Sequence, residues 1–283
     1  MAETGAKPAT HSGAAMSATD LVVVWEAATL QAELAAEQLW GRGATAVELR
    51  PDGPGTTLVA SFPTSAAATT VAGEIGGQVV EVAPDWIDAW RAYAEPVHVG
   101  GLVVAPAWRD VPVTDATVLR IDPGPCFGSG THPSTRLLLS LLAADPPVGL
   151  RVADVGAGSG ILAVAAAVLG AASVQAVDID PYSAAIIWGN ASRNGVASVV
   201  RARTGSAHEL EGPVDLALVN VTAAVQVELA PAVLAAVAPG GRILLAGLLP
   251  GQWRHIAGAF PDCEVRHQPD LDGWVGAELL PVR

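Results

Sequence analysis

The stretch DVGAGSG at residues 154–160 constrains the fold of this chain more than any other part of it. An apolar run precedes it and an apolar helical pattern follows it, which predicts a strand that ends in a tight turn and enters a helix directly. Gly156 and Gly158 tolerate positive φ angles and let the backbone approach a ligand closely. About 20 residues later, Asp178 ends the next apolar run, where a carboxylate can accept hydrogen bonds from a ribose diol. The pattern predicts a site for an adenosine-type cofactor.

Strand-like and helix-like segments alternate from Arg151 onward. This alternation is typical of a doubly wound α/β protein, in which ligands bind at the carboxyl ends of parallel strands. Asp154, Asp178 and Asn220 all fall at or just after predicted strand ends. A final run at 275–281 is expected to complete a mostly parallel, seven-stranded, Rossmann-like sheet. The other predicted segments are 152–155, 161–169, 174–177, 183–194, 199–202, 214–219, 225–237 and 242–246.

An earlier group of segments follows the order βαββαβ, which predicts a small α+β, ferredoxin-like domain over residues 20–83. We expect residues 1–19 to be a disordered extension. Trp86 and Trp90 stand at helical spacing, so residues 84–100 are predicted to be a helical linker before a cofactor domain at 101–283. The segments of the small domain are 21–25, 29–40, 44–49, 57–61, 65–75 and 78–82.

The net charge of −13 argues against direct binding to nucleic-acid phosphates, which requires clusters of Lys and Arg. Residues 20–95 hold 11 acidic residues and 3 arginines, which leaves −8 on this part of the chain. Such an acidic module could dock a basic protein, or it could simply be a solvated face. The two cysteines, Cys126 and Cys263, lack the spacing of a metal site and favour a reducing, cytoplasmic setting. No apolar run approaches the roughly 20 residues of a membrane span, and the polar N-terminus does not resemble a secretory signal.

A second glycine-rich segment, PGPCFGSGTHPSTR at 123–136, precedes the first strand of the predicted cofactor domain. Glycine and proline at this density predict a loop, and Pro133 is expected to begin a helix that extends to about Leu142. This loop is well placed to lie over a ligand, and Thr135 could offer its hydroxyl group to it. His132, taken alone, is read as an ordinary loop residue.

The glycine spacing narrows the choice of cofactor. Ile161 stands where the dinucleotide fingerprint G-x-G-x-x-G requires its last glycine. An acidic residue at Asp154 crowds a pyrophosphate but suits the cationic amino-acid end of S-adenosyl-L-methionine. Alternatively, Asp154 is a turn residue that binds its own backbone. The glycine-rich loop by itself does not exclude a nicotinamide dinucleotide as the cofactor.

Several motifs occur together and in order: DWIDAW at 85–90, APAWRDVP at 105–112, FGSGTHPST at 127–135, DVGAGSGILA at 154–163, AVDIDP at 176–181 and NVTA at 220–223. With them the chain resembles the PrmA-type ribosomal protein methyltransferases, which modify the stalk-base protein of the large ribosomal subunit. The resemblance implies a class I, Rossmann-like methyltransferase domain preceded by a substrate-recognition domain. It also implies cofactor contacts at Thr135, Gly156, Asp178 and Asn220, with Phe127 near the cofactor.

The resulting hypothesis is methyl transfer from S-adenosyl-L-methionine to lysine ε-amino groups, or an N-terminal α-amino group, of a basic ribosomal protein. Asn220 is the candidate catalytic residue that orients the amine through its side-chain carbonyl, and no residue is assigned as a general base. We expect a monomer without a metal. The alternatives are a methyltransferase acting on another protein or a small molecule, a nicotinamide-dependent oxidoreductase, and a docking protein without activity.

Overall fold

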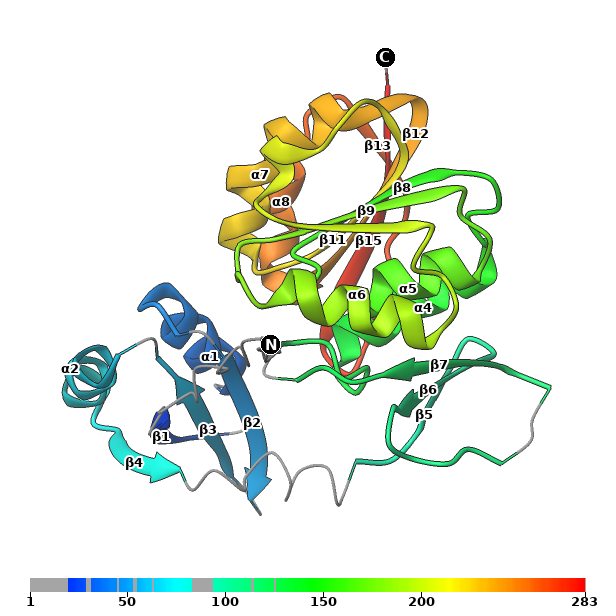
Figure 1. Ribbon diagram of the computed structural model, residues 1–283. Coiled ribbons are helices and arrows are strands. Elements are labelled where there is room, and N and C mark those ends of the chain that lie inside the picture. Colours follow the sequence, from blue (N-terminus) through cyan, green and yellow to red (C-terminus); the bar gives the residue numbers. More distant parts are fainter. Residues whose placement is uncertain are drawn as a thin grey trace, which may run out of the picture. The chain divides into compact units, whose positions relative to one another are not determined.

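The computed structural model (Figure 1) describes residues 20–28, 32–44, 46–52, 55–62, 64–82, 94–112, 115–124 and 126–282. The chain divides into two compact units, Met1–Trp86 and Ile87–Arg283. The extension predicted at 1–19 lies outside the described residues, as does residue range 83–93, which holds most of the predicted linker helix.

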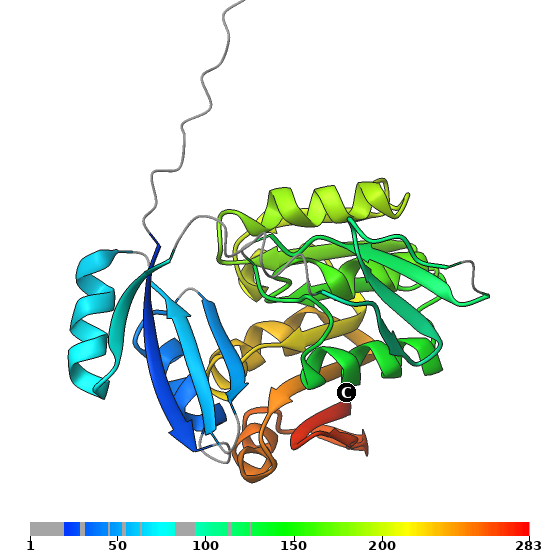
Figure 2. The same cartoon turned by 90° about the horizontal axis from the view of Figure 1, so that it is seen from below.

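The first unit contains β1 (Asp20–Ala28), α1 (Ala32–Gly41), β2 (Ala46–Asp52), β3 (Gly55–Ser61), α2 (Ser65–Ile75) and β4 (Gln78–Val82). Its four strands form an antiparallel sheet in the order β2-β3-β1-β4, visible side by side in Figure 2. Leu39 of α1, Leu58 of β3 and Val71 of α2 belong to one buried cluster. Both helices therefore pack against the same face of the sheet.

The second unit opens with a small sheet of β5 (Val97–Val99), β6 (Leu102–Pro106) and β7 (Thr117–Ile121). Strand β5 corrects the prediction that the helical linker extends to residue 100. Gly100 and Gly101 have φ angles of 56° and 84°, which allow a tight reversal, and Val99 pairs with Leu102 across it. This hairpin, with its β-branched residues, favours a strand over a helix at 97–99.

The main sheet has seven strands on one path, in the order β10-β9-β8-β11-β12-β15-β13, and β14 pairs with β15 beside this path. The neighbours from β10 to β12 are parallel, whereas β15 runs antiparallel to β12 and to β13. The strands are β8 (Arg151–Val155), β9 (Ser173–Asp178), β10 (Val200–Thr204), β11 (Val214–Asn220), β12 (Val237–Leu248), β13 (Cys263–His267), β14 (Asp270–Leu271) and β15 (Trp274–Pro281).

Helices cover both faces of this sheet: α4 (Pro133–Ala144), α5 (Ile161–Val168) and α6 (Ser183–Arg193) on one face, α7 (Ala223–Ala236) and α8 (Trp253–Ala259) on the other (Figure 1). Alternate residues of one strand belong to the two cores. Leu216 and Leu218 lie in the cluster that contains α5 and α6, whereas Ala217 and Val219 lie in the cluster that contains α7. A strand buried on both faces is continuously apolar, which is the pattern seen at 216–219. Among the described residues, no helix combines the length and apolar character of a membrane-spanning segment.

Candidate functional site

The carboxyl ends of three neighbouring strands meet in the second unit. Val155 at the end of β8 pairs with Val177 of β9 on one side and with Val219 of β11 on the other. The strand order reverses beside β8, because β9 and β10 extend to one side of it and β11 and β12 to the other. This is the position at which open α/β sheets bind their ligands. Gly156, Asp178 and Asn220 follow or end these strands, so the structure brings three of the predicted site residues together.

The loop at 156–160, called here the 156–160 loop, requires glycine for two separate reasons. Gly156 and Gly158 have φ angles of 71° and 53°, which side-chain-bearing residues rarely adopt. A Cβ atom on Gly158 would also lie 2.5 Å from the carbonyl oxygen of Phe127, and one on Gly156 would collide with the Val221 side chain. The backbone is therefore packed closely on both sides of this turn.

Asp178 connects the end of β9 to this loop. Its Oδ2 accepts a hydrogen bond from the Gly158 N–H at 2.7 Å, and its Oδ1 accepts from the Asp180 N–H at 2.9 Å. A carboxylate has about four acceptor positions, so two remain for the hydroxyl groups of a ligand. The side chain is partly exposed, which is compatible with the ribose-binding role predicted for it.

Asp154 does not lie at the surface of the site. The residue is completely buried, and its Oδ2 accepts from the Ala163 N–H at 2.9 Å, in the first turn of α5. Its Oδ1 is buried without a partner among the described residues. Burial is the main cause that raises the pKa of Asp154 to about 7. This position does not support direct contact with a cationic ligand. It also differs from the alternative of a turn residue that binds its own backbone, because the carboxylate accepts from the helix that follows, nine residues further along the chain.

A second glycine-rich segment, the 126–131 loop, is fastened to the 156–160 loop. The Ser159 N–H donates to the Phe127 carbonyl at 2.8 Å, and Ser159 Oγ donates to the Gly128 carbonyl at 2.7 Å. The Phe127 side chain remains 44% exposed. The two loops, about 30 residues apart in sequence, therefore form one hydrogen-bonded structure with an apolar ring available at its surface.

Thr135 and Asn220 are in direct contact. Asn220 Nδ2 donates to Thr135 Oγ1 at 3.2 Å, although 85 residues separate the two in sequence. Thr135 is completely buried in α4, whereas Asn220 is partly exposed. Because the Nδ2 group faces Thr135, the carbonyl oxygen Oδ1 remains available as an acceptor. Gly247 leaves room beside this oxygen, since a Cβ atom there would lie 3.3 Å from it.

His132 has a definite structural role. It is the N-cap of α4, where Nδ1 lies 3.3 Å from the Ser134 N–H and 2.7 Å from Ser134 Oγ. Its ring meets Phe127 and Trp274 edge to face, at centroid distances of 5.3 and 4.5 Å. Burial lowers the pKa of His132 to about 4, so the imidazole is neutral at physiological pH. The reading of His132 as an ordinary loop residue is therefore corrected: it orders the start of α4.

Three buried polar residues that hold the site were missed: Ser159, Asn190 and Gln226. Gln226 Nε2 donates to the Val221 carbonyl at 2.8 Å and to the Ala246 carbonyl at 2.6 Å, which ties the end of β12 to the residue after Asn220. Asn190 and Gln226 are polar residues within apolar helical patterns, and that break in the pattern is the signal that could have revealed them. Ser159 lies within the glycine turn and has no such signal.

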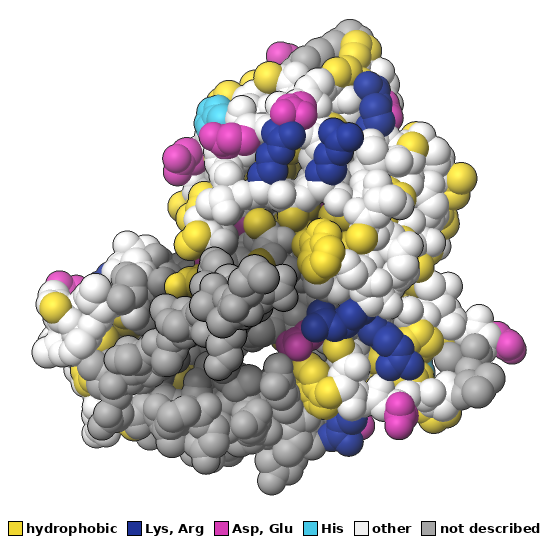
Figure 3. Space-filling model, in the orientation of Figure 1, with side chains coloured by type: hydrophobic (Ala, Val, Ile, Leu, Met, Phe, Trp, Pro, Cys, Tyr) yellow, Lys and Arg dark blue, Asp and Glu magenta, His cyan; other side chains and the backbone are white. Residues whose placement is uncertain are grey.

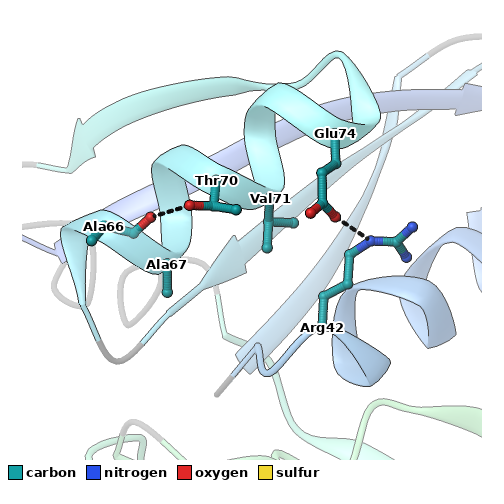
Figure 4. A pocket seen from close by; sticks show the side chains of 6 residues that line it. All are labelled: Arg42, Ala66, Ala67, Thr70, Val71 and Glu74. Atoms are coloured by element: carbon teal, nitrogen blue, oxygen red, sulfur yellow. Dashed lines mark hydrogen bonds and ion pairs between the residues drawn. The ribbon is translucent and has the colours of Figure 1, made fainter.

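A groove of about 460 Å³ lies elsewhere, in the first unit, and is shown in Figure 4. The Arg42–Glu74 ion pair, with Nε 3.2 Å from Oε2, is part of its lining. Thr70 Oγ1 donates to the Ala66 carbonyl at 2.9 Å. These polar groups already have partners, and we assign no ligand to the groove.

The parallel strands with an antiparallel β15, the glycine turn after β8, and the acid and amide at the ends of β9 and β11 define an α/β protein of the Rossmann-like methyltransferase class. A sequence model of the ribosomal protein L11 methyltransferase (PrmA) family matches residues 12–277. The chain belongs to this family, and the resemblance seen in its motifs is confirmed.

Individual relatives agree with this result. A ribosomal protein L11 methyltransferase of Symbiobacterium thermophilum is 43% identical over 195 residues, covering 68% of this chain and 64% of the relative. A ribosomal protein L11 methyltransferase of Pelotomaculum thermopropionicum is 47% identical over 168 residues, covering 58% of this chain and 54% of the relative. The match thus spans less than two thirds of the length of these curated relatives. A crystal structure of a ribosomal protein L11 methylase from Lactobacillus delbrueckii subsp. bulgaricus superposes with a TM-score of 0.62 at 30% identity, over 67% of this chain and 100% of that one.

Proposed function

We propose that this protein transfers methyl groups from S-adenosyl-L-methionine to amino groups of ribosomal protein L11. The observation that carries the proposal is the family match over residues 12–277, which includes every residue of the candidate site. The relatives named above are ribosomal protein L11 methyltransferases. The site adds chemical support, because it presents a carboxylate, an amide oxygen and an apolar ring around a glycine-rich turn.

The residues at the strand ends fit the proposed cofactor. The turn at Gly156 and Gly158 would hold its amino-acid part against the backbone, since no side chain can occupy these positions. The free acceptor positions of Asp178 suit the ribose hydroxyl groups. Phe127 would contact the adenosyl or methionine part, with Thr135 behind Asn220. When bound, the cofactor supplies a methyl group on a sulfonium, already activated toward attack by an amine.

Asn220 is the proposed catalytic residue. Its Oδ1 would accept a hydrogen bond from the attacking amine and direct the nitrogen lone pair toward the methyl carbon. With the cofactor bound, an N–C bond would form as the C–S bond breaks, the sulfur would become a neutral thioether, and the proton of the amine would pass to solvent. A lysine has an ordinary pKa near 10.4, so desolvation beside a cation is needed to favour its neutral form. The contribution of the protein is orientation and exclusion of water.

The first unit is proposed to be a ferredoxin-like substrate-recognition domain over residues 20–83. Its element order and its strand order β2-β3-β1-β4 support this assignment. The charge of −8 over residues 20–95 suits a basic protein partner. We further propose that the cofactor domain occupies residues 101–283 and that the protein acts as a monomer.

Direct binding to nucleic acid is not part of the proposal. On the face drawn in Figure 3, arginine side chains of the described residues lie beside acidic ones. Arg203 and Glu211 are paired at 2.6 Å, and Arg151 and Asp215 at 2.7 Å. Paired arginines contribute less to a phosphate-binding surface than free ones. We propose that the activity takes place in the cytoplasm, because the proposed substrate is a ribosomal protein.

The test is incubation of the purified chain with radiolabelled S-adenosyl-L-methionine and purified ribosomal protein L11. We expect label in L11, and at least a hundredfold loss of turnover in Asn220→Ala without a large change in melting temperature. Asn194→Ala, outside the site, serves as the control. Wild-type turnover in Asn220→Ala would remove Asn220 from the mechanism. Label in a small molecule but never in L11, or tight binding of a nicotinamide dinucleotide without binding of S-adenosyl-L-methionine, would overturn the proposal.

A further inference from the structure

Asn190 is a completely buried side chain of α6 whose hydrogen-bonding capacity is entirely used. Its Oδ1 accepts from the Asp122 N–H at 2.9 Å and from Arg193 Nη1 at 3.0 Å. Its Nδ2 donates to the carbonyl oxygens of Asp122 and Ser159, both at 2.9 Å. A carboxamide has two donor hydrogens and two acceptor lone pairs, so no position remains free. The partners also fix the orientation of the amide, because two carbonyls must face its NH₂ group.

The backbone partners of Asn190 lie just ahead of one glycine-rich loop of the site and within the other. Asp122 lies four residues before the 126–131 loop, and its Oδ1 accepts from the Gly124 N–H at 3.1 Å. Ser159 lies within the 156–160 loop and binds the carbonyls of Phe127 and Gly128. Asn190 therefore joins the chain just ahead of the 126–131 loop to the 156–160 loop, and Ser159 joins the two loops a second time. Asp122, Ser159 and Arg193, the residues that Asn190 binds, are not among the residues predicted to contact the cofactor.

Asn194, one helical turn further along, provides an internal comparison. Its Oδ1 accepts from the Arg120 N–H at 2.9 Å and its Nδ2 donates to the Arg120 carbonyl at 2.8 Å. Four residues along a helix rise about 6 Å and two residues along a strand about 6.6 Å, so the two asparagines match alternate residues of one extended segment. Asn194 thus makes the same kind of bond pair as Asn190, but it does not reach the 156–160 loop.

We propose that Asn190 is a positioning residue, which sets the 126–131 loop against the 156–160 loop in the arrangement that binds the cofactor. This inference rests on the proposed function. Loss of the amide leaves the carbonyls of Asp122 and Ser159 without their donor, so the two loops are held less firmly, through the bonds of Ser159 to Phe127 and Gly128. The effect is specific to ligand binding, because Asn194 and the cores on both faces of the sheet still hold α6 in place.

The experiment compares wild-type protein, Asn190→Ala and the matched control Asn194→Ala. The dissociation constant for S-adenosyl-L-methionine is measured by calorimetry, at a temperature at least 15 °C below the lowest melting temperature of the three. We expect Asn190→Ala to weaken binding by about tenfold or more, whereas Asn194→Ala stays within about twofold of wild type. Asn190→Asp, which retains the acceptor for the Asp122 N–H but lacks the NH₂ group, is measured if Asn190→Ala does not fold, with the same expectation.

Equal affinity in wild type and the Asn190 variant, or equal weakening in the Asn190 and Asn194 variants, would overturn this inference while leaving the proposed function intact. Absence of binding by the wild-type chain would instead overturn the proposed function itself. A melting temperature that falls equally in both variants, combined with weakened binding in the Asn190 variant alone, would support the positioning role against a merely structural one.

Discussion

Asp154 makes the stability of this protein depend on pH in a direction opposite to that of most carboxylates. Burial raises its pKa in the folded chain from 3.8 to about 7. Between these two values the folded state holds a proton that the unfolded state has lost, so the free energy of unfolding falls as pH rises and levels off above pH 7. The full difference corresponds to about 4 kcal/mol at alkaline pH, at 1.36 kcal/mol for each pKa unit.

The perturbation is Asp154→Asn, which keeps an oxygen for the Ala163 N–H and removes the titration. Free energies of unfolding are measured in urea at pH 5.5 and pH 8.5, both above the isoelectric point of about 4.7. The free energy of unfolding of the variant, relative to that of wild type, should rise by about 2 kcal/mol from pH 5.5 to pH 8.5. This is less than the full difference, because the part of the effect that occurs below pH 5.5 is not measured.

Asp215→Asn is the matched control. A hydrogen bond from Arg151 is the main cause that lowers the pKa of Asp215, so this carboxylate is ionised in both states throughout the measured range. Its contribution is lost only under acidic conditions, and the difference between Asp215→Asn and wild type should not change between pH 5.5 and 8.5. If the difference in free energy of unfolding between Asp154→Asn and wild type is also the same at pH 5.5 and pH 8.5, the reasoning is refuted.

Two further substitutions test the packing of the site. Gly158→Ala should lower the free energy of unfolding by about 2 kcal/mol or more and weaken cofactor binding, because a Cβ atom would lie 2.5 Å from the Phe127 carbonyl oxygen at a φ of 53°. Urea unfolding measures the stability and calorimetry the affinity, and unchanged values of both would contradict the close packing. Gln226→Leu should cost about 2–4 kcal/mol, since the carbonyls of Val221 and Ala246 lose their buried donor. Its turnover should fall with affinity for the cofactor retained, and a turnover equal to that of wild type would show that this bond does not position the residues beside Asn220.

Local signals predicted much of the fold. The helix at 65–75 and the strand at 78–82 were predicted with their observed ends, because Thr64 caps the helix through the Ala67 N–H and Gly76 ends it with a φ of 71°. The strand β13 was missed because only one of its residues is not exposed, so it carries no apolar period. Strand β14, of two residues, is too short for any pattern.

The site was predictable in part. The glycine turn and Asp178 follow from the order of strand, turn and helix. The contact of Thr135 with Asn220 spans 85 residues and was not predicted, although the family resemblance implied that each of the two residues contacts the cofactor. The position of Asp154 could not be read from its sequence neighbours, because a carboxylate at a strand end can face either the ligand or the helix that follows. Asn190 was overlooked because three of its four hydrogen bonds are to backbone groups, which a sequence does not distinguish from one another.

The hydrogen bonds of Asn190 and Asn194 to the chain ahead of the 126–131 loop also cover the exposed edge of a β-sheet. Strand β7 lies at one end of its three-stranded sheet, and its Ile121 carbonyl faces inward, where it accepts from the Ala107 N–H at 3.0 Å. The backbone groups of Arg120 and Asp122 face the other way, and the two carboxamides occupy them. An open edge strand is a template for pairing with another chain. Here two asparagine side chains from the α6 region bind the backbone groups of that edge, so the hydrogen bonds that order the loops also oppose aggregation.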